Sequence, residues 1–480
     1  MSSSEPNLTF EKPPSSPTAK TAAGSVLVFL IIVEISSGFV QGFYTPLLPD
    51  LARHVGVSGE AMNWFQTAQA MAAAVMVPLL SRMGDVFGAR KVLRGAILSV
   101  LVGTLIIALA PSYPLVLVGR IFIGPLGVWL PLAIAIIYVR AAGGSATRSI
   151  SILSASLMGG IVIGTVASGL AEAFLTSLPV ILLVPSVMVL LSAYSVFFKL
   201  PKDVNLSAGR IDWIGFAGLG GFMLTFILAL AFVGPTHGTT ATILFIVTLV
   251  VFALWVWWES RVEQPAVDLK LVISKTMGPL YVSAFAVGVV MIDVPPNLAD
   301  YMSRDPQTFG YGFGATSGLL AAMISLLLLF AVTGALLSSF IMARVGMRST
   351  LVGACLLGAL GQAMLLPLSS VAVILWISGS LTGFGMGILV GTLPALVTHA
   401  APKGSTGIAN GIYASLLAMG GAVGGAVFKQ VLAAFRDENR ITALGGYMTI
   451  WGVTTVLFLL AALMMATVAL PTSTSNSAHA

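Results

Sequence analysis

The sequence predicts an all-α polytopic membrane protein with about fourteen transmembrane helices. Three observations support this fold class: a very low content of charged residues, a series of long apolar runs, and a one-sided distribution of Lys and Arg between the loops. Together they predict how often the chain crosses a bilayer and which way it faces.

The composition requires an apolar environment around most of the chain. Of the 480 residues, 57% are hydrophobic and 8% are charged, and the mean hydropathy is +1.01. A soluble domain carries about 25% charged residues, so this chain cannot cover its surface with polar groups. A bilayer fits such a surface. The net charge of +6 is small and does not indicate a nucleic-acid partner.

Apolar runs of membrane-spanning length recur along the whole chain. A helix needs about 20 residues to cross the hydrocarbon layer. The polar, Ser- and Pro-rich segment 1–24 is expected to be a disordered cytoplasmic tail, and 471–480 a second cytoplasmic tail. The expected spans are 25–48, 61–82, 92–110, 114–139, 149–171, 178–199, 211–234, 240–258, 277–296, 313–340, 349–367, 370–397, 406–431 and 444–470.

The basic residues test this count, because Lys and Arg stay on the cytoplasmic side when short loops are inserted. With the N-terminus in the cytoplasm, 17 of the 23 Lys and Arg residues fall in cytoplasmic segments, 4 fall outside and 2 fall within spans. Splitting or fusing one span would invert every later loop. The asymmetry therefore favours fourteen spans, with both termini cytoplasmic, in the inner (plasma) membrane of the cell.

Two short loops repeat. The segment 81–91 follows the second span, and 341–349 follows the tenth. Gly88 aligns with Gly346 and Arg90 with Arg348. Repeats of this kind are common in secondary transporters that were built by duplication.

The first of these loops resembles the signature loop between the second and third helices of the major facilitator superfamily. It keeps the acid, the glycine and the basic pair, at Asp85, Gly88, Arg90 and Lys91. It departs from the pattern at Ser81 and Val86, where the family has Gly and often Arg. The resemblance implies that the loop latches a cytoplasmic gate. The alternative is a simple basic anchor on the cytoplasmic side.

Other segments resemble the same family. Gly119–Pro125 is similar to its fourth-helix motif, whose Arg points into the central cavity. The glycine-rich fifth span resembles the antiporter motif, although Thr165 stands where that motif has Pro. Arg210–Gly215 and Trp257–Arg261 resemble the ends of the extra helix pair in the fourteen-helix drug:proton antiporters.

The resemblance implies a two-bundle architecture. The expected parts are a six-helix bundle at 25–200, an extra helix pair at 211–258 and a second six-helix bundle at 275–470. It also implies a proton-coupled exporter of a small organic compound or drug that works by alternating access, as a monomer in the lipid bilayer. The alternatives are uptake or exchange of a polar metabolite, and a membrane sensor on the same fold that transports nothing.

Two charges inside the predicted spans are candidates for the coupling site, because an intramembrane charge is costly and is usually functional. Glu34 lies near the middle of the first span, and Arg120 lies about one-third of the way down the fourth. Both helices line the cavity in the family. We expect Glu34 to exchange protons and Arg120 to pair with it or modulate it. The alternative is a static ion pair that fixes helix packing.

Polar side chains extend this candidate cavity. Asn63, Gln66 and Gln69 recur at a spacing of three on the second span, which places them on one helix face. Gln41 on the first span could face them. The stripe is interpreted as lining the cavity, and the alternative is hydrogen bonding between helices.

A second candidate site lies near the outer end of the ninth span. Asp293, Asn297 and Asp300 cluster beside Pro295 and Pro296. Prolines free backbone carbonyl groups, and an irregular helix end that lines a cavity could bind a cation. The alternative is an ordinary external loop.

Missing motifs exclude several functions. There is no Gly-x4-Gly-Lys-Ser/Thr loop for ATP and no His-Glu-x2-His zinc motif. Cys355 is the single cysteine, so the sequence holds no disulfide framework and no cysteine-based zinc site. We therefore expect no enzymatic activity, no cofactor and no metal.

Overall fold

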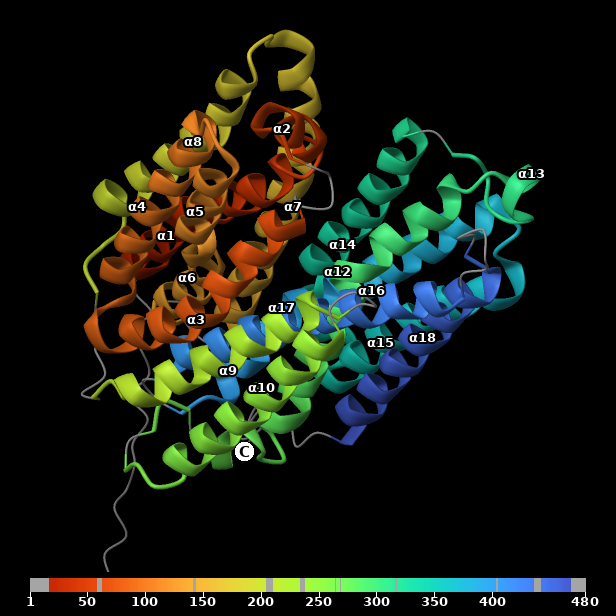
Figure 1. Cartoon of the computed structure of the whole chain (residues 1–480). Helices are drawn as coiled ribbons and strands as arrows, with labels where there is room; N and C mark the ends of the chain where they lie inside the picture. The colour runs from red at the N-terminus through yellow and green to blue at the C-terminus, as the bar shows by residue number, and fades with distance from the viewer. Residues whose placement is uncertain are drawn as a thin grey trace, which may run out of the picture.

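The computed structural model describes residues 17–57, 63–140, 144–203, 210–233, 238–263, 265–267, 269–315, 317–402, 405–435 and 442–467. These residues are almost entirely helical, and the long helices form two lobes that meet along one side (Figure 1). Helix α1 begins at Pro17, inside the segment predicted as a tail. Residues 1–16 and 471–480 of the predicted tails lie outside the described residues.

The first lobe holds six membrane-length helical segments. The fourth of them is interrupted by a 3₁₀ turn that contains Pro125, and the sixth ends in a π turn. The elements are α1 (Pro17–Phe43), α2 (Leu48–Val55), α3 (Asn63–Phe87), α4 (Ala89–Leu109), α5 (Tyr113–Ile123), η1 (Gly124–Val128), α6 (Trp129–Tyr138), α7 (Gly144–Phe174), α8 (Leu178–Tyr194) and η2 (Ser195–Lys199).

The second lobe follows an inserted helix pair. Helix α9 (Trp213–Ala231) packs against α10 (Gly238–Glu259) and also against α3 and α17, so the pair covers a line where the two lobes meet (Figure 1). The remaining elements are α11 (Leu269–Val272), α12 (Met277–Ser303), α13 (Pro306–Phe309), α14 (Ser317–Val345), α15 (Met347–Leu368), α16 (Ala372–Ala400), α17 (Thr406–Ala434) and α18 (Leu444–Thr467).

The helix count agrees with the predicted membrane topology. Among the described residues, 13 helical spans are long and apolar enough to cross a membrane. Helix α12 has 27 residues but a shorter apolar stretch, Met277–Met291, and completes the predicted set. Large apolar side chains point outward from these spans, as Leu249 and Leu254 of α10 do. Such side chains fit contact with lipid rather than water.

Glycines let helices cross backbone to backbone at equivalent places in the two lobes. A Cβ atom on Gly38 of α1 would lie 1.9 Å from the carbonyl oxygen of Leu157 in α7. A Cβ atom on Gly288 of α12 would lie 1.9 Å from the carbonyl oxygen of Leu417 in α17. The reciprocal contacts repeat too: a Cβ atom on Gly160 would lie 2.3 Å from the carbonyl oxygen of Ile35, and one on Gly420 would lie 2.0 Å from that of Phe285. The internal repeat in the loops thus extends to helix packing.

We predict that Gly38→Val prevents α1 and α7 from packing. Its Cβ would overlap a backbone oxygen that no rotamer change can move, which costs about 3 kcal/mol or more. The matched control is Gly169→Val on α7, where a Cβ atom meets no heavy atom within 4 Å. The folded yield after detergent extraction, measured by size exclusion, should fall sharply for the first variant only. Equal yields would contradict the crossing described here.

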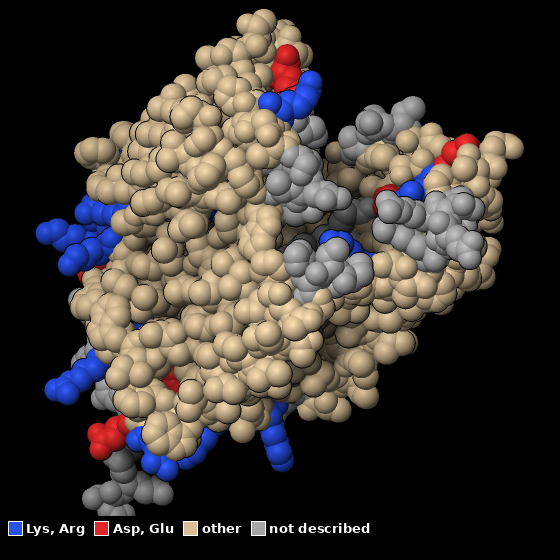
Figure 2. All heavy atoms as spheres, viewed as in Figure 1, with Lys and Arg blue, Asp and Glu red and all other residues tan. Residues whose placement is uncertain are grey.

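The two ends of the helices differ in charge. Most of the described Lys and Arg residues lie near the turns after α3, α8, α10 and α14, and they gather along the left and lower edge of Figure 2. We call this the basic end and the opposite one the far end. Between the two lobes the surface at the far end is hollowed, whereas the lobes contact each other toward the basic end (Figure 2).

Candidate functional site

Asp85 joins the two lobes at the basic end. Its carboxylate, at the end of α3, accepts hydrogen bonds from the backbone N–H groups of Gly407 and Ile408, each at 2.9 Å. These N–H groups belong to the first turn of α17, where a helix leaves donors unpaired and carries a partial positive charge. The predicted gate loop therefore has a charge-assisted contact with the other half of the chain.

Small residues bring α3 and α17 close enough for this contact. A Cβ atom on Gly407 would lie 2.6 Å from the Oδ1 atom of Asp85, and one on Gly411 would lie 2.4 Å from the Oγ atom of Ser81. Ser81 is fully buried. This explains a departure from the family pattern, since the serine at position 81 packs against a glycine of the partner helix.

A second seam joins α7 of the first lobe to α14 and α16 of the second, and it is held differently. The Ser151 hydroxyl donates to the carbonyl oxygen of Gly391 at 2.8 Å and accepts from the Ser338 hydroxyl at 3.1 Å. Nearer the basic end, Thr147 and His399 lie within hydrogen-bond distance at 3.2 Å. In the loop repeat Ala343 occupies the place of Asp85, so this seam has no equivalent acid.

The rest of the gate loop braces the first lobe. Gly88 begins α4 with a φ of 106°, which favours glycine, and packs on the carboxylate of Asp203. Arg90 donates to the carbonyl oxygens of Val196 and Phe197 in η2, and its backbone N–H donates to Asp203. Lys91 is exposed. Arg90 thus binds carbonyl groups within its own lobe rather than an acid across the molecule.

Glu34 lies inside the first lobe without a partner. It is 0% exposed, and neither carboxylate oxygen has a hydrogen-bond partner among the described residues. The next turns of α1 face α7 through Gly38, so α1 lies against α7 at this depth. An ionised carboxylate at such a place costs several kcal/mol unless it is paired.

Arg120 is also buried but lies elsewhere. Its guanidinium group donates to the carbonyl oxygen of Phe65 at 3.1 Å and to the side-chain oxygen of Gln66 at 2.6 Å. It lies 3.9 Å from the centre of the Phe65 ring and 5.6 Å from that of Tyr44. Aromatic faces and carbonyl oxygens stabilise a buried guanidinium group without any carboxylate.

The expected contact between Glu34 and Arg120 is absent in this conformation. Arg120 lies over Tyr44, ten residues beyond Glu34 along the chain, and a helix rises 1.5 Å per residue. The backbone positions of Glu34 and Tyr44 therefore differ by about 15 Å along the helix axis. The 3₁₀ turn η1 begins after Arg120, so the fourth span is not one straight helix.

The predicted glutamines have different surroundings. Gln66 is exposed and bound to Arg120, Gln69 is half-buried, and the side chain of Asn63 lies outside the described residues. Gln41 is exposed and lies 3.4 Å from the hydroxyl of Ser37 on its own helix. Gln66 is thus the one of the three glutamines that the structure brings to the buried charge.

The candidate outer site lies on a helix. Helix α12 continues past Pro295 to Ser303, so these residues do not form an external loop. Asp300 accepts two bonds from Arg304, at 2.8 and 2.9 Å, and one from the hydroxyl of Tyr447 at 2.5 Å. The side chain of Asp293 lies outside the described residues, and Asn297 has a partner. Asp300 is therefore already neutralised, and the described residues hold no metal-binding cluster.

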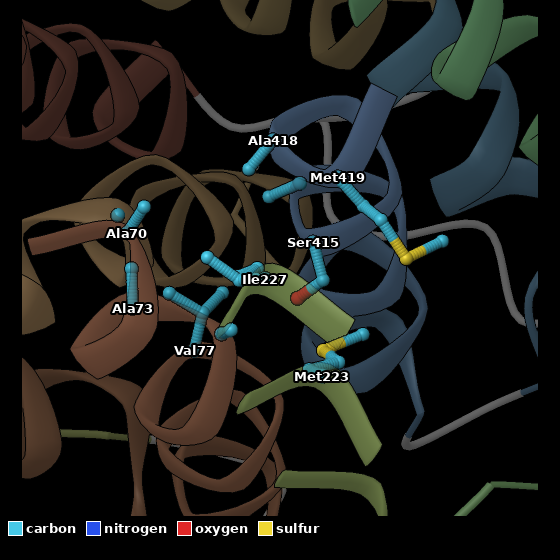
Figure 3. Close-up of a pocket in the computed structure, with 11 residues that line it drawn as sticks. Ala70, Ala73, Val77, Met223, Ile227, Ser415, Ala418 and Met419 are labelled. Carbon is cyan, nitrogen blue, oxygen red and sulfur yellow. The ribbon is translucent and has the colours of Figure 1, made fainter. Parts of the chain in front are cut away.

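A small cavity lies where the inserted pair meets both lobes. Its volume is about 70 Å³, and its walls come from α3, η1, α9 and α17 (Figure 3). The lining is apolar except for the hydroxyl of Ser415, which is buried without a hydrogen-bond partner among the described residues. Because both lobes supply its walls, the cavity exists only while they are in contact here. The lining includes Ala73, Val77, Met223, Ile227, Ala418 and Met419.

We predict that Ala73→Val, at a half-buried position of the cavity wall, fills part of the cavity and stabilises the contact between the lobes. Two added methyl groups contribute about 1.5 kcal/mol when they are buried without strain. The variant should raise the melting temperature of the purified protein by a few degrees. Ala253→Val, on the exposed face of α10, is the matched control and should leave it unchanged. A lower melting temperature for Ala73→Val alone would show that the cavity has no room for the side chain.

Comparison with known proteins fits this architecture. The chain matches the family model of the Major Facilitator Superfamily over residues 30–425. The chain belongs to the Major Facilitator Superfamily. It is 26% identical to the multidrug resistance protein Stp of Mycobacterium tuberculosis over 444 residues, 86% of this chain and 75% of that protein. It is 23% identical to a uridine/deoxyuridine transporter of Lactococcus lactis over 346 residues, 68% and 71% of the two chains.

Solved structures of the superfamily share the fold. The human organic anion transporter MFSD10 aligns with a TM-score of 0.68 at 14% identity, covering 94% of this chain and 100% of that one. The nucleoside transporter NupG aligns with a TM-score of 0.55 at 14% identity, covering 92% and 99%. The protein is therefore a multi-pass membrane transporter and not an enzyme, as the sequence predicted.

Sequence reasoning missed several partners in this transporter. Asp203 lies in a short loop just after Lys202, with nothing in the pattern to mark it as a cap for α4. Nothing in the sequence pattern marks Phe65 and Tyr44 as partners of Arg120. For the seam that includes Ser151 and His399, the sequence contains one usable signal. The second loop repeat has Ala343 where the first has Asp85, so the second repeat lacks an acid that could form the same contact.

Proposed function

We propose that the protein is a secondary active transporter that couples export of a small organic compound to uptake of protons, with Glu34 as the proton site. The observation that carries this proposal is the fully buried Glu34 carboxyl group, which has no partner among the described residues. No packing role requires an acid there, because an apolar or amide side chain would be cheaper to bury. A role in binding and releasing a proton explains why an acid occupies this buried position.

The shape of the molecule supports alternating access. The lobes are closed at the basic end through Asp85 and open toward the hollow at the far end (Figure 2). Because basic loops remain in the cytoplasm, we infer that the basic end is cytoplasmic and that this conformation faces outward. An outward-facing transporter with a protonated Glu34 is the state that an exporter reaches after it has released its cargo and bound a proton.

Coupling follows from the cost of the buried charge. Glu34 can lose its proton only when the lobes rearrange so that water or a cation reaches it, since an unpaired buried carboxylate is strongly destabilised. Return to the inward-facing state would supply that access on the cytoplasmic side. Arg120, which lies over Tyr44 just beyond the end of α1, is a buried cation that could then respond to a negative charge.

A second candidate is proton-coupled uptake of a polar metabolite. The relative from Lactococcus lactis is named a transporter of uridine and deoxyuridine, and the exposed Gln66 beside Arg120 offers polar groups for such a cargo. A sensor that moves nothing is the third possibility. All three share the fold, so the direction of proton movement must separate them.

The test is cargo-dependent proton flux in proteoliposomes that contain the purified full-length chain and a pH-sensitive dye. Uridine, an organic anion and a panel of lipophilic cationic dyes serve as cargoes, added on one side without an imposed pH gradient. Protons moving opposite to a cargo support export by antiport. Protons moving with the cargo overturn export in favour of uptake, and no cargo-dependent flux across the whole panel overturns transport coupled to protons.

A further inference from the structure

An open groove runs between α3 and α4 at the basic end. It measures about 640 Å³ and is lined mainly by apolar side chains, with Lys91 at one end. Its α3 wall includes Met76, Met83 and Phe87, and the middle of its α4 wall consists of the small residues Gly95, Ala96 and Ser99. The contrast between long and small side chains leaves the space between the helices unfilled. We call it the α3–α4 groove.

The groove faces the surroundings of the helix bundle. Gly95 is exposed, and a Cβ atom there would meet no heavy atom within 4 Å. It belongs to an exposed stripe of α4 at helical spacing. The other members of this stripe are Lys91, Leu98, Val102, Leu105 and Leu109. A helix face of this composition contacts lipid in a membrane protein, so acyl chains are the molecules that have access to the groove.

Lys91 supplies a free positive charge at the membrane-surface end of the groove. Its neighbours Arg90 and Arg94 both donate to the carbonyl oxygen of Phe197 and are therefore occupied. Among the described residues Lys91 has neither a side-chain hydrogen bond nor an ion pair, and its side chain is exposed. It also lies in the first turn of α4, where the helix dipole adds positive potential.

We propose that the α3–α4 groove binds an anionic phospholipid, with one acyl chain between the two helices and the phosphate group at Lys91. The apolar wall accounts for the chain, and the unpaired ammonium group accounts for the preference for negative charge, since basic residues beside membrane helices attract acidic headgroups. A lipid in this place braces α3, the helix that ends in the Asp85 contact between the lobes.

The first experiment fills the groove. The purified full-length protein in detergent is incubated with phosphatidylglycerol, and the lipids that it retains are counted by native mass spectrometry. Gly95→Leu should retain one lipid fewer than the unmodified protein, whereas Gly169→Leu, also exposed and unobstructed, should retain the same number. Melting temperatures are measured for both variants to confirm folding. Equal retention by all three proteins overturns the proposal.

The second experiment tests the charge. Removal of one basic residue at a membrane surface costs about 1 kcal/mol of attraction, which corresponds to about fivefold in affinity. Lys91→Gln should therefore weaken phosphatidylglycerol binding about fivefold and leave phosphatidylcholine binding unchanged. Lys202→Gln, at an exposed position of the same end, is the control. If the unmodified protein binds both lipids equally, or if Lys91→Gln keeps the preference, the groove does not select an anionic lipid.

Discussion

Glu34→Gln is expected to abolish proton-coupled transport while leaving a folded protein in the membrane. Glutamine has the shape of the protonated acid, and the site already holds that acid without a hydrogen bond to any described residue. The variant cannot lose a proton, so the cycle should stop at the step that requires release. Cargo-dependent proton flux in proteoliposomes should fall to the level of empty liposomes at every pH.

The matched control for this experiment is Glu172→Gln, an exposed acid near the far end of α7. It removes the same charge from the same lobe and should keep its flux. Size-exclusion profiles and melting temperatures of both variants establish that they fold. If Glu34→Gln transports cargo with undiminished proton movement, Glu34 is not the coupling site, and the unpaired carboxyl group needs another explanation.

Asp85→Asn should shift the two lobes toward opening at the basic end. The substitution removes the charge and one of the two acceptors that bind the first turn of α17. Hydrogen bonds to a charged group contribute about 1.5–3 kcal/mol. A loss of this size raises the open population about 10- to 100-fold.

Reaction of a thiol can measure this opening. Cys355 is buried in the core of the second lobe. A cysteine introduced in a Ser81→Cys background lies instead at the contact between the lobes, so opening of this contact exposes the new thiol to a reagent. Labelling by a polar maleimide should be slow in that background and faster by the same factor when Asp85→Asn is added. Asp203→Asn is the control, because Asp203 caps α4 within one lobe. Equal acceleration by both substitutions would show general loosening rather than release of a latch.

The fold was predictable from the sequence because a bilayer imposes strict rules on the chain. Every span must be apolar and about 20 residues long, and Lys and Arg mark the cytoplasmic loops. The loop repeat also marks Asp85 and Gly88, because a tight turn between two long spans needs a glycine and leaves a helix end for an acid to contact. The boundaries of the two bundles remain a prediction, although the matched contacts of Gly38 and Gly288 agree with a duplicated unit.

The candidate site was predictable only in part. Hydropathy identified Glu34 and Arg120 as charges inside spans, but it gave their depths only along their own helices. The packing of α5 on α3 places Arg120 beside Phe65 instead of beside Glu34. Contacts of this kind depend on how helices tilt and on which backbone groups they expose, and a single sequence records neither.

The glycine crossings have a mechanical consequence for the transport cycle. Helix α1 has 27 residues and is about 40 Å long, and it is fixed to α7 by backbone contacts at Gly38 and Gly160. Because these contacts involve backbone atoms, no side chain can change its rotamer to accommodate a shift of one helix against the other. We therefore expect each lobe to move as a rigid body. Separation of the lobes at the basic end would then be accompanied by closure of the hollow at the far end. We expect Gly38, Gly160, Gly288 and Gly420 to couple the two ends of the transporter, because their close packing keeps each lobe rigid.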